Sequence, residues 1–271
     1  MIRLIPLDAD GVRRGLGSAA GDVTVRLHDT IDSTNTAARR AAEADRAAGR
    51  VPSVTLFCAR AQTAGRGRLG RDFFSPAGSG LYMTLLYPTS LPLTEAVGVT
   101  AGAAVAAAGA VEAMTGLTPG IKWVNDLYLG GRKVSGILTE AVGPLCAGQP
   151  TCLLIGIGLN LTTQTFPDGL RAPAAALADF MPDGAVLDAG LLCGRITGTL
   201  LAMLHDNVFF SPSCLSAYRS RLLWRGQPVV CTRGNDRFPA ILRDVDDRYR
   251  LIADTGNGTV LLDSGEVSVS G

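Results

Sequence analysis

The stretch Gly65-Arg66-Gly67-Arg68-Leu69-Gly70-Arg71 follows an apolar run, Val54 to Ala59, that is typical of a β-strand. Glycine permits a positive φ and a close approach of the backbone to a ligand. Arginine presents a rigid fork of donors that matches phosphate and carboxylate oxygens. The stretch therefore predicts a loop that clamps a small anion. A solvated basic turn or an RNA-binding Gly/Arg patch is the alternative, and the P-loop pattern is absent.

The composition limits what this loop can bind. The chain has 271 residues, 47% of them hydrophobic, and a formal net charge of +1. Such a chain can form one large domain, or a large domain with a small appendage. Its near-neutral charge provides no global field to attract DNA or anionic lipid, so the local arginine cluster favours a small anion over a polymer.

Cysteine usage and hydropathy indicate the compartment. The six cysteines are scattered without a CxxC pair, and we expect buried, reduced thiols of a cytoplasmic protein. The two histidines are too few for a histidine-rich metal site. The start of the chain lacks the apolar core of a signal peptide. Ala96 to Val111 is apolar but shorter than the about 20 residues that span a membrane, so it predicts a buried helix.

Hydrophobic patterning predicts a mixed α+β fold. The expected strands are Val23 to Leu27, Val54 to Ala59, Leu81 to Tyr87, Ile121 to Val124 and a central strand from Cys152 to Gly158. The expected helices are Thr36 to Ala48, Thr94 to Thr115, Leu187 to Phe210 and Ser213 to Leu223.

The character of the sequence changes after Trp224. Five short strands separated by Gly and Asp turns fit into fewer than fifty residues, which predicts a small barrel. The expected strands are Pro228 to Thr232, Phe238 to Arg243, Tyr249 to Ala253, Thr259 to Leu262 and Glu266 to Val269. We place a domain boundary near Leu223, which divides the chain into residues 1–223 and 224–271.

A second polar segment converges on one spot. The run Lys122-Trp123-Val124-Asn125-Asp126 leads into a hairpin whose second strand begins at Lys133, after the turn Gly130-Gly131. Asp126 and Lys133 are expected to be neighbours across the ladder. An ordinary exposed hairpin with a surface ion pair is the alternative. The Gly156-Ile157-Gly158 strand is weak evidence for nucleotide binding, and it better fits a strand that lies next to a ligand.

Taken together, these segments resemble biotin–protein ligases in order and spacing. The matching segments are 32–35 (DSTN), 62–68 (QTAGRGR), 122–126 (KWVND), 132–138 (RKVSGIL) and 156–160 (GIGLN), and 264–268 (SGEVS) resembles the end of the family's C-terminal domain. The resemblance implies a catalytic domain similar to class II aminoacyl-tRNA synthetases, followed by an SH3-like barrel. It also implies formation of biotinyl-5′-adenylate from biotin and ATP with Mg²⁺, and transfer to a lysine of a biotin carboxyl carrier domain.

By motif position, the resemblance assigns residues to roles. The biotin-binding residues would be Ser33, Thr34, Asn35, Gln62, Gly65, Arg66, Gly67, Arg68, Lys133, Gly136 and Ile137. The nucleotide would be held by Arg68, Arg71, Phe73, Lys122, Asn125 and Asn160, and the catalytic residues would be Arg66, Arg68, Lys133 and Asp126. Asp126 is also the carboxylate expected to bind Mg²⁺ or to help deprotonate the acceptor lysine.

The sequence departs from the family at two positions. Phe73 stands where many members have Trp, which weakens stacking on adenine. Val124 replaces the more usual Pro. About twenty residues precede Val23, which is too few for the DNA-binding domain of some family members, so we expect a ligase that does not bind DNA. We also expect that it does not bind a membrane and that it is a monomer or a homodimer. Lipoate–protein ligases share the fold and are the nearest alternative, and an adenylate-binding regulatory module is another.

Overall fold

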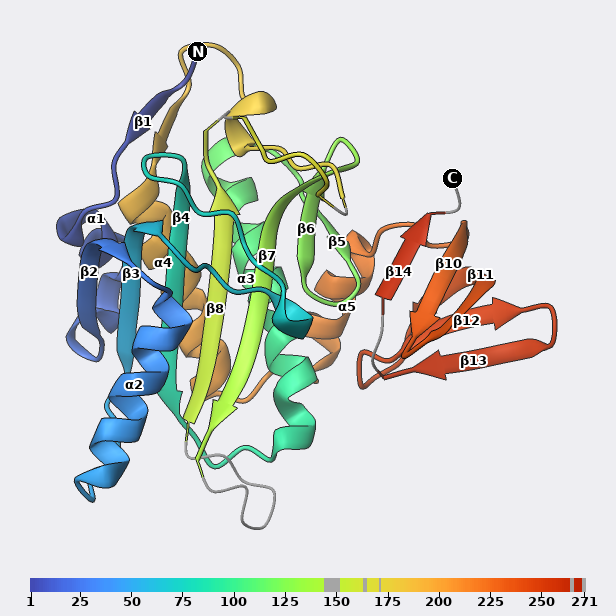
Figure 1. Cartoon of the computed structure of the whole chain (residues 1–271), viewed down its shortest axis with the longest axis horizontal. Helices are drawn as coiled ribbons and strands as arrows, with labels where there is room; N and C mark the ends of the chain where they lie inside the picture. The colour runs from blue at the N-terminus through green and yellow to red at the C-terminus, as the bar shows by residue number, and fades with distance from the viewer. Residues whose placement is uncertain (144–151, 163–164, 171, 264–265, 270–271) are drawn as a thin grey trace.

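The computed structural model describes residues 1–143, 152–162, 165–170, 172–263 and 266–269 (Figure 1). Cys146 and the expected Ser264-Gly265 turn lie outside the described residues. The five described cysteines are all buried and free, as expected.

The centre of the molecule is a seven-stranded sheet. Its strand order is β2-β3-β4-β8-β7-β6-β5, with β2 and β3 parallel and the other neighbours antiparallel. The bounds are β2 Thr24–Ile31, β3 Thr55–Gln62, β4 Gly80–Pro88, β8 Cys152–Asn160, β7 Arg132–Val142, β6 Asp126–Leu129 and β5 Gly120–Lys122. The prediction that the strand beginning at Cys152 is central is confirmed.

Helices cover both faces of this sheet (Figure 1). Helix α2 (Thr34–Ala47) packs on one face, over a small core that includes Phe57 and Leu154. Helices α3 (Ala96–Thr115), α4 (Ala189–His205) and α5 (Pro212–Arg221) contribute to the larger core on the other face. The neighbours Phe57 and Cys58 belong to different cores because successive side chains of a strand point to opposite faces.

Helix α3 confirms the expected buried helix. The segment Leu93–Thr115 is long and apolar enough to cross a membrane, but 67% of its apolar window is buried inside the protein. A Cβ atom at Gly98 or Gly102 would lie 2.4 or 2.5 Å from the rings of Phe210 and Phe209. The small residues therefore allow close packing in the core.

Several element boundaries differ from the predictions. Strand β2 continues to Ile31 and α2 begins at Thr34, two residues earlier than expected. Trp123 and Val124 lie in the turn between β5 and β6 and not in a strand. Helix α4 begins after Asp188, whose side chain accepts a hydrogen bond from the Leu191 amide, and ends at His205 instead of reaching Phe210.

The N-terminal segment forms structure that the patterning did not predict. Strand β1 (Arg3–Ile5) pairs in parallel with β9 (Val186–Asp188), and helix α1 (Ala9–Leu16) crosses α4. Asp8 caps α1 by accepting a hydrogen bond from the Gly11 amide at 2.6 Å. The two helices approach closely, since a Cβ at Gly15 would lie 2.4 Å from the Leu191 carbonyl oxygen.

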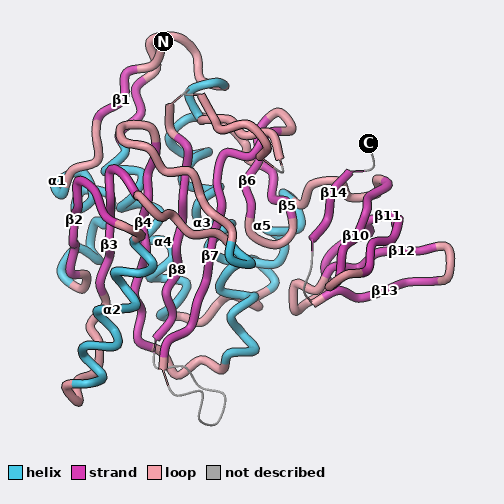
Figure 2. Tube along the Cα trace, in the orientation of Figure 1, coloured by secondary structure: helices cyan, strands magenta, loops and turns pink. Residues whose placement is uncertain are grey.

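The residues after α5 form a separate sheet. In Figure 2 its described residues are strands and loops. The five strands are all antiparallel in the order β13-β12-β11-β10-β14, as in an SH3-like domain. Their bounds are β10 Pro228–Arg233, β11 Asp236–Val245, β12 Leu251–Thr255, β13 Gly258–Leu262 and β14 Glu266–Val269. The five predicted short strands are confirmed, and the exact boundary at 223/224 stays a prediction.

The two sheets are joined by specific contacts. The buried Trp123 indole donates a hydrogen bond to the Tyr249 carbonyl at 2.7 Å. From α5, the Arg219 guanidinium donates to the Val245 carbonyl at 2.7 Å. The turn that carries the 122–126 motif is therefore anchored by the C-terminal sheet.

Candidate active site

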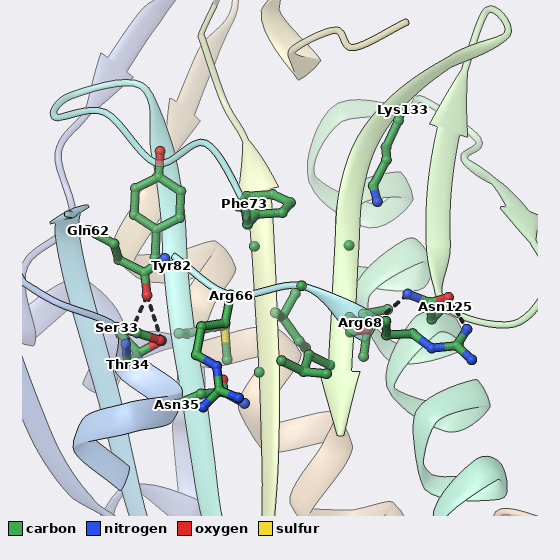
Figure 3. A pocket seen from close by; sticks show the side chains of 18 residues that line it. Ser33, Thr34, Asn35, Gln62, Arg66, Arg68, Phe73, Tyr82, Asn125 and Lys133 are labelled. Atoms are coloured by element: carbon green, nitrogen blue, oxygen red, sulfur yellow. Dashed lines mark hydrogen bonds between the residues drawn. The ribbon is translucent and has the colours of Figure 1, made fainter. Parts of the chain in front are cut away.

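A pocket lies on the sheet face that α2 also covers, between the N-terminus of α2, the Gly/Arg loop and the strands β4, β8 and β7 (Figure 3). Twelve of its lining residues were assigned to the site from the sequence: Ser33, Thr34, Asn35, Gln62, Arg66, Gly67, Arg68, Phe73, Asn125, Lys133, Gly136 and Ile137. The others are Tyr82, Met83, Leu138, Gly156, Ile157 and Gly158. Motifs that lie far apart in the sequence thus meet in one place.

One end of the pocket, which we call the neutral end, consists of Ser33, Thr34, Asn35 and Gln62. The Thr34 amide and hydroxyl both donate to Gln62 Oε1, at 2.8 and 3.1 Å. The Gln62 amide nitrogen donates to the Ser75 hydroxyl at 2.9 Å. Because Ser33, Thr34 and Asn35 are buried, these uncharged groups are held in fixed orientations.

Asn35 lies flat across the sheet. The Thr84 hydroxyl on β4 donates to Asn35 Oδ1 at 2.7 Å, and Asn35 Nδ2 donates to Glu140 on β7 at 2.8 Å. Between them runs β8, where a Cβ atom on Gly156 would lie 2.0 Å from Asn35 Oδ1. A glycine is therefore required at position 156 for Asn35 to cross the strand.

The other end, which we call the cation end, consists of Arg66, Arg68 and Lys133. The Lys133 ammonium lies 2.8 Å from Asp126 Oδ1, so the expected neighbours meet as an ion pair, although in the ladder Lys133 lies opposite Tyr128 and Asp126 opposite Gly136. Arg68 donates to Asn125 Oδ1 at 2.8 Å, and Arg66 lies 3.4 Å from Glu140 Oε1. Arg66 and Lys133 remain 45% and 28% exposed, so each cation has an acceptor on the protein yet can still reach a ligand.

The Gly/Arg loop is held by its own backbone. Gly67 N donates to the Arg71 carbonyl at 2.7 Å, and Phe73 N donates to the Gly65 carbonyl at 2.9 Å. Its glycines serve different purposes. Gly70 has φ +71°, whereas Gly65 is required by packing, because its Cβ would lie 2.3 Å from the Phe73 carbonyl oxygen. Gly67 has φ −118° and only ordinary contacts, so neither reason applies to it.

Phe73 lies inside the pocket, on the floor formed by two paired glycines. Gly136 of β7 and Gly158 of β8 are register partners, and a Cβ on Gly158 would lie 2.5 Å from the Phe73 ring. The ring also meets Tyr82 edge to face at 6.4 Å. Burial raises the pKa of the Tyr82 hydroxyl, although a hydrogen bond with Ser79 opposes the shift. The Gly-x-Gly strand thus lies next to the site, as expected, and in the described structure Asn35 and Phe73 cover it.

Five residues assigned from the sequence do not line the pocket: Gly65, Arg71, Lys122, Asp126 and Asn160. Lys122 Nζ lies 5.8 and 5.7 Å from the ring centroids of Tyr128 and Trp224. Asn160 is buried and donates to the Ala175 carbonyl at 2.9 Å. Asp126 lies behind Lys133 and accepts from both Lys133 and Asn125 at the same oxygen, Oδ1.

Among the described residues, no three His, Cys, Asp or Glu side chains gather as a metal-binding group. Mg²⁺ typically keeps several waters and binds through substrate phosphates with one or two carboxylates. The described residues offer no dedicated metal cage, and the assignment of Asp126 as a magnesium ligand stays a prediction.

Comparison with known proteins identifies the family. The biotin/lipoate A/B protein ligase family matches residues 27–160. The bifunctional ligase/repressor BirA of Bacillus spizizenii is 35% identical over 267 residues, which are 97% of this chain and 79% of that protein. The chain belongs to the biotin–protein ligase family. The biotin–[acetyl-CoA-carboxylase] ligase of Mycobacterium tuberculosis is 29% identical over 97% of this chain and 95% of its own length.

Solved structures of biotin–protein ligases match the fold as well. The enzyme of Aquifex aeolicus, solved in complex with biotin and ATP, is 25% identical with a TM-score of 0.71, covering 90% of this chain and 97% of its own. The predicted architecture of a mixed catalytic sheet followed by an SH3-like sheet is thereby confirmed.

The functional residues that sequence reasoning missed lie on strands of this biotin–protein ligase fold. Glu140 contacts both ends of the pocket but follows the 132–138 segment by two residues and belongs to no motif quoted from the sequence. Tyr82 and Thr84 sit in an apolar strand whose pattern indicates only burial. The alternation of Tyr82 and Thr84 on one face of β4 was the one available signal.

Proposed function

We propose that this protein joins biotin to ATP to form biotinyl-5′-adenylate and pyrophosphate, and then transfers the biotinyl group to a lysine of a biotin carrier domain. The observation that carries the proposal is the pairing of a buried neutral end with a cation end in one pocket. The neutral end suits an uncharged ring, and the cation end suits a carboxylate and a phosphate that are brought together.

The neutral end matches the hydrogen-bonding groups of the ureido ring of biotin. That ring offers two N–H donors and one carbonyl acceptor. The side chains of Ser33, Thr34 and Asn35 provide hydroxyl and amide groups at the pocket wall. Gln62, Thr84 and Glu140 already orient these groups, so biotin binding immobilises few additional side chains and costs little conformational entropy.

The cation end supplies what adenylation requires. The biotin carboxylate is ionised at neutral pH, so its attack on the α-phosphorus needs no general base. An oxygen–phosphorus bond forms as the bond to pyrophosphate breaks, and negative charge develops on the phosphate oxygens. Arg66, Arg68 and Lys133 line the same pocket, which supports the proposal that they align the two anions and stabilise that charge. Mg²⁺ brought in with ATP would supply further charge neutralisation, and Asp126 would be the protein carboxylate to hold it.

The second step transfers an acyl group. A neutral lysine amine of the carrier domain attacks the acyl carbon, a carbon–nitrogen bond forms, and adenylate leaves with the electrons of the carbon–oxygen bond. The amine must lose a proton. We assign this proton to the carboxylate of Asp126, which pairs with Lys133 of the cation end, and magnesium binding is the alternative role of that carboxylate.

The proposed partner is the carrier domain of a biotin-dependent carboxylase in the cytoplasm. The near-neutral net charge and the burial of α3 support a protein that binds neither DNA nor a membrane. We propose a monomer or homodimer.

Pyrophosphate release tests the proposal directly. The purified protein is incubated with ATP and Mg²⁺, with biotin in one arm and lipoate in the other. Rapid release with biotin is the expected result. Release with lipoate alone would assign the chain to the lipoate branch of the family and overturn the proposal.

A further inference from the structure

Glu140 faces three donors from two segments, Asn35 and Arg39 on α2 and Arg66 on the Gly/Arg loop. Its carboxylate accepts from Asn35 Nδ2 at 2.8 Å and from Arg39 Nη2 at 3.0 Å, and it lies 3.4 Å from Arg66 Nη2. It is only 16% exposed and does not line the pocket. We propose that Glu140 is a positioning residue that fixes the biotin-binding amide of Asn35 and keeps Arg66 at the pocket mouth. The inference rests on the proposed function.

Glu140 decides the orientation of the Asn35 amide. A side-chain amide can be flipped, and only its hydrogen-bond partners decide which way it points. An ionised carboxylate can only accept, so Glu140 forces the amide nitrogen of Asn35 toward β7. The amide oxygen is then turned toward β4, where the Thr84 hydroxyl donates to it at 2.7 Å.

The sheet holds this arrangement in register. Thr84 on β4 pairs with Gly156 on β8, and Gly156 pairs with Leu138 on β7, two residues before Glu140. The amide of Asn35 therefore lies directly above Gly156, and its hydrogen bonds reach Thr84 at the same level of the sheet and Glu140 two residues farther along β7. Any loss of the Glu140 carboxylate releases one end of this span at the wall of the neutral end.

Glu140 also contacts Arg66. Two guanidinium groups share the Glu140 carboxylate, and they are not equivalent. Arg39 is nearer and 30% exposed, whereas Arg66 is farther and 45% exposed. Arg66 is therefore the cation that can turn to a bound anion while Arg39 remains on Glu140. Figure 3 shows the Arg66 guanidinium beside Asn35, where the two ends of the pocket meet.

The test compares Glu140→Gln with wild type. The glutamine has the same shape but no charge, and its NH₂ group cannot accept from Asn35 or from the arginines. Pyrophosphate release is measured with varied biotin at saturating ATP. Because hydrogen bonds to a charged group are lost, we expect KM for biotin to rise about ten- to a hundredfold, with a smaller change in kcat. Glu140→Asp should restore part of the loss because it keeps the charge.

Glu43→Gln is the matched control, since Glu43 is exposed on the same helix as Asn35 but away from the pocket, and it should leave KM unchanged. A wild-type KM for biotin in Glu140→Gln, or a lower kcat with KM unchanged, would overturn the inference. If Glu140→Gln does not unfold cooperatively, KM for biotin is measured with Glu140→Asp instead. A KM several-fold above wild type then supports the inference, and a wild-type KM contradicts it. Absence of release by wild-type protein with biotin would instead refute the proposed function.

Discussion

The two ends of the pocket are built in opposite ways. At the neutral end, Thr34, Gln62 and Ser75 bond to one another and are largely shielded from water. At the cation end, Arg68 donates a hydrogen bond to Asn125, and Lys133 forms an ion pair with Asp126. A ligand can join the neutral end without breaking these bonds, but it must share or replace the acceptors at the cation end.

This difference separates recognition from chemistry. Pre-oriented neutral groups give affinity and specificity, because little ordering is needed on binding. The contacts with Asn125, Asp126 and Glu140 hold the cations in place before a ligand binds, and we infer that the developing charge of the transition state draws the cations toward it. Substitutions at the neutral end should therefore act mainly on KM for biotin, and substitutions at the cation end on the rate of adenylation.

The largest effect is expected at the cation end. Lys133→Ala and Arg68→Ala should each slow adenylation about a hundred- to a thousandfold, because each removes a charge that stabilises the transition state. Single-turnover formation of the adenylate from biotin and ATP measures this rate. Arg50→Ala serves as control, since Arg50 lies at the far end of α2 and pairs with Asp45. A near-normal adenylation rate in either pocket variant would contradict the proposal that the cation end acts on the rate and the neutral end on biotin binding.

A smaller effect is expected from the strand that supports the neutral end. Gly156→Ala places a methyl group 2.0 Å from Asn35 Oδ1, so the amide must move, and KM for biotin should rise about tenfold or more. Gly109→Ala is the matched control in α3, where the added Cβ meets nothing within 4 Å. That control should stabilise the protein by about 0.5–1 kcal/mol, measured by denaturant unfolding. Equal biotin KM values in the two variants would contradict the close approach.

The hydroxyl of Thr34 provides a finer test of the same end. Thr34→Val keeps the shape and removes the hydroxyl that donates to Gln62, and KM for biotin should rise several-fold, by about 1 kcal/mol of binding energy. Thr34→Ser retains the hydroxyl and should stay close to wild type. If Thr34→Val instead lowered kcat and left KM unchanged, the neutral end would take part in the chemistry.

The smallest effects distinguish two glycines of the loop. Gly67→Ala should change adenylation by less than about twofold, because its backbone is extended and its Cβ has room. Gly65→Ala should slow it more, since its Cβ would clash with the Phe73 carbonyl and displace the loop. Adenylation rates of the two variants, compared at equal folded fraction, measure the difference. The reverse ranking would show that the loop needs flexibility at Gly67.

The sequence predicted the strands and one ion pair of the site, but it did not predict Glu140 or helix α1. Local patterns predicted the strands and the ion pair of Asp126 and Lys133, because a short turn brings the two strands of the hairpin together. Glu140 could not be found this way, since its partner Asn35 lies 105 residues away and joins it only through the order of β4, β8 and β7. Helix α1 carried a local signal, since Asp8 caps it and the buried Val12 and Leu16 are four residues apart, but its close packing on α4 depends on glycine contacts between distant segments.

The most direct test of the account is the mass of a purified carrier domain after incubation with this protein, biotin, ATP and Mg²⁺. We expect the carrier domain to gain the mass of one biotinyl group on the acceptor lysine. Arg68→Ala should greatly slow this modification, and a higher biotin concentration should restore its rate in Thr34→Val. Two outcomes would contradict the proposed function. The carrier domain could stay unmodified, or it could gain a lipoyl group with lipoate and no group with biotin.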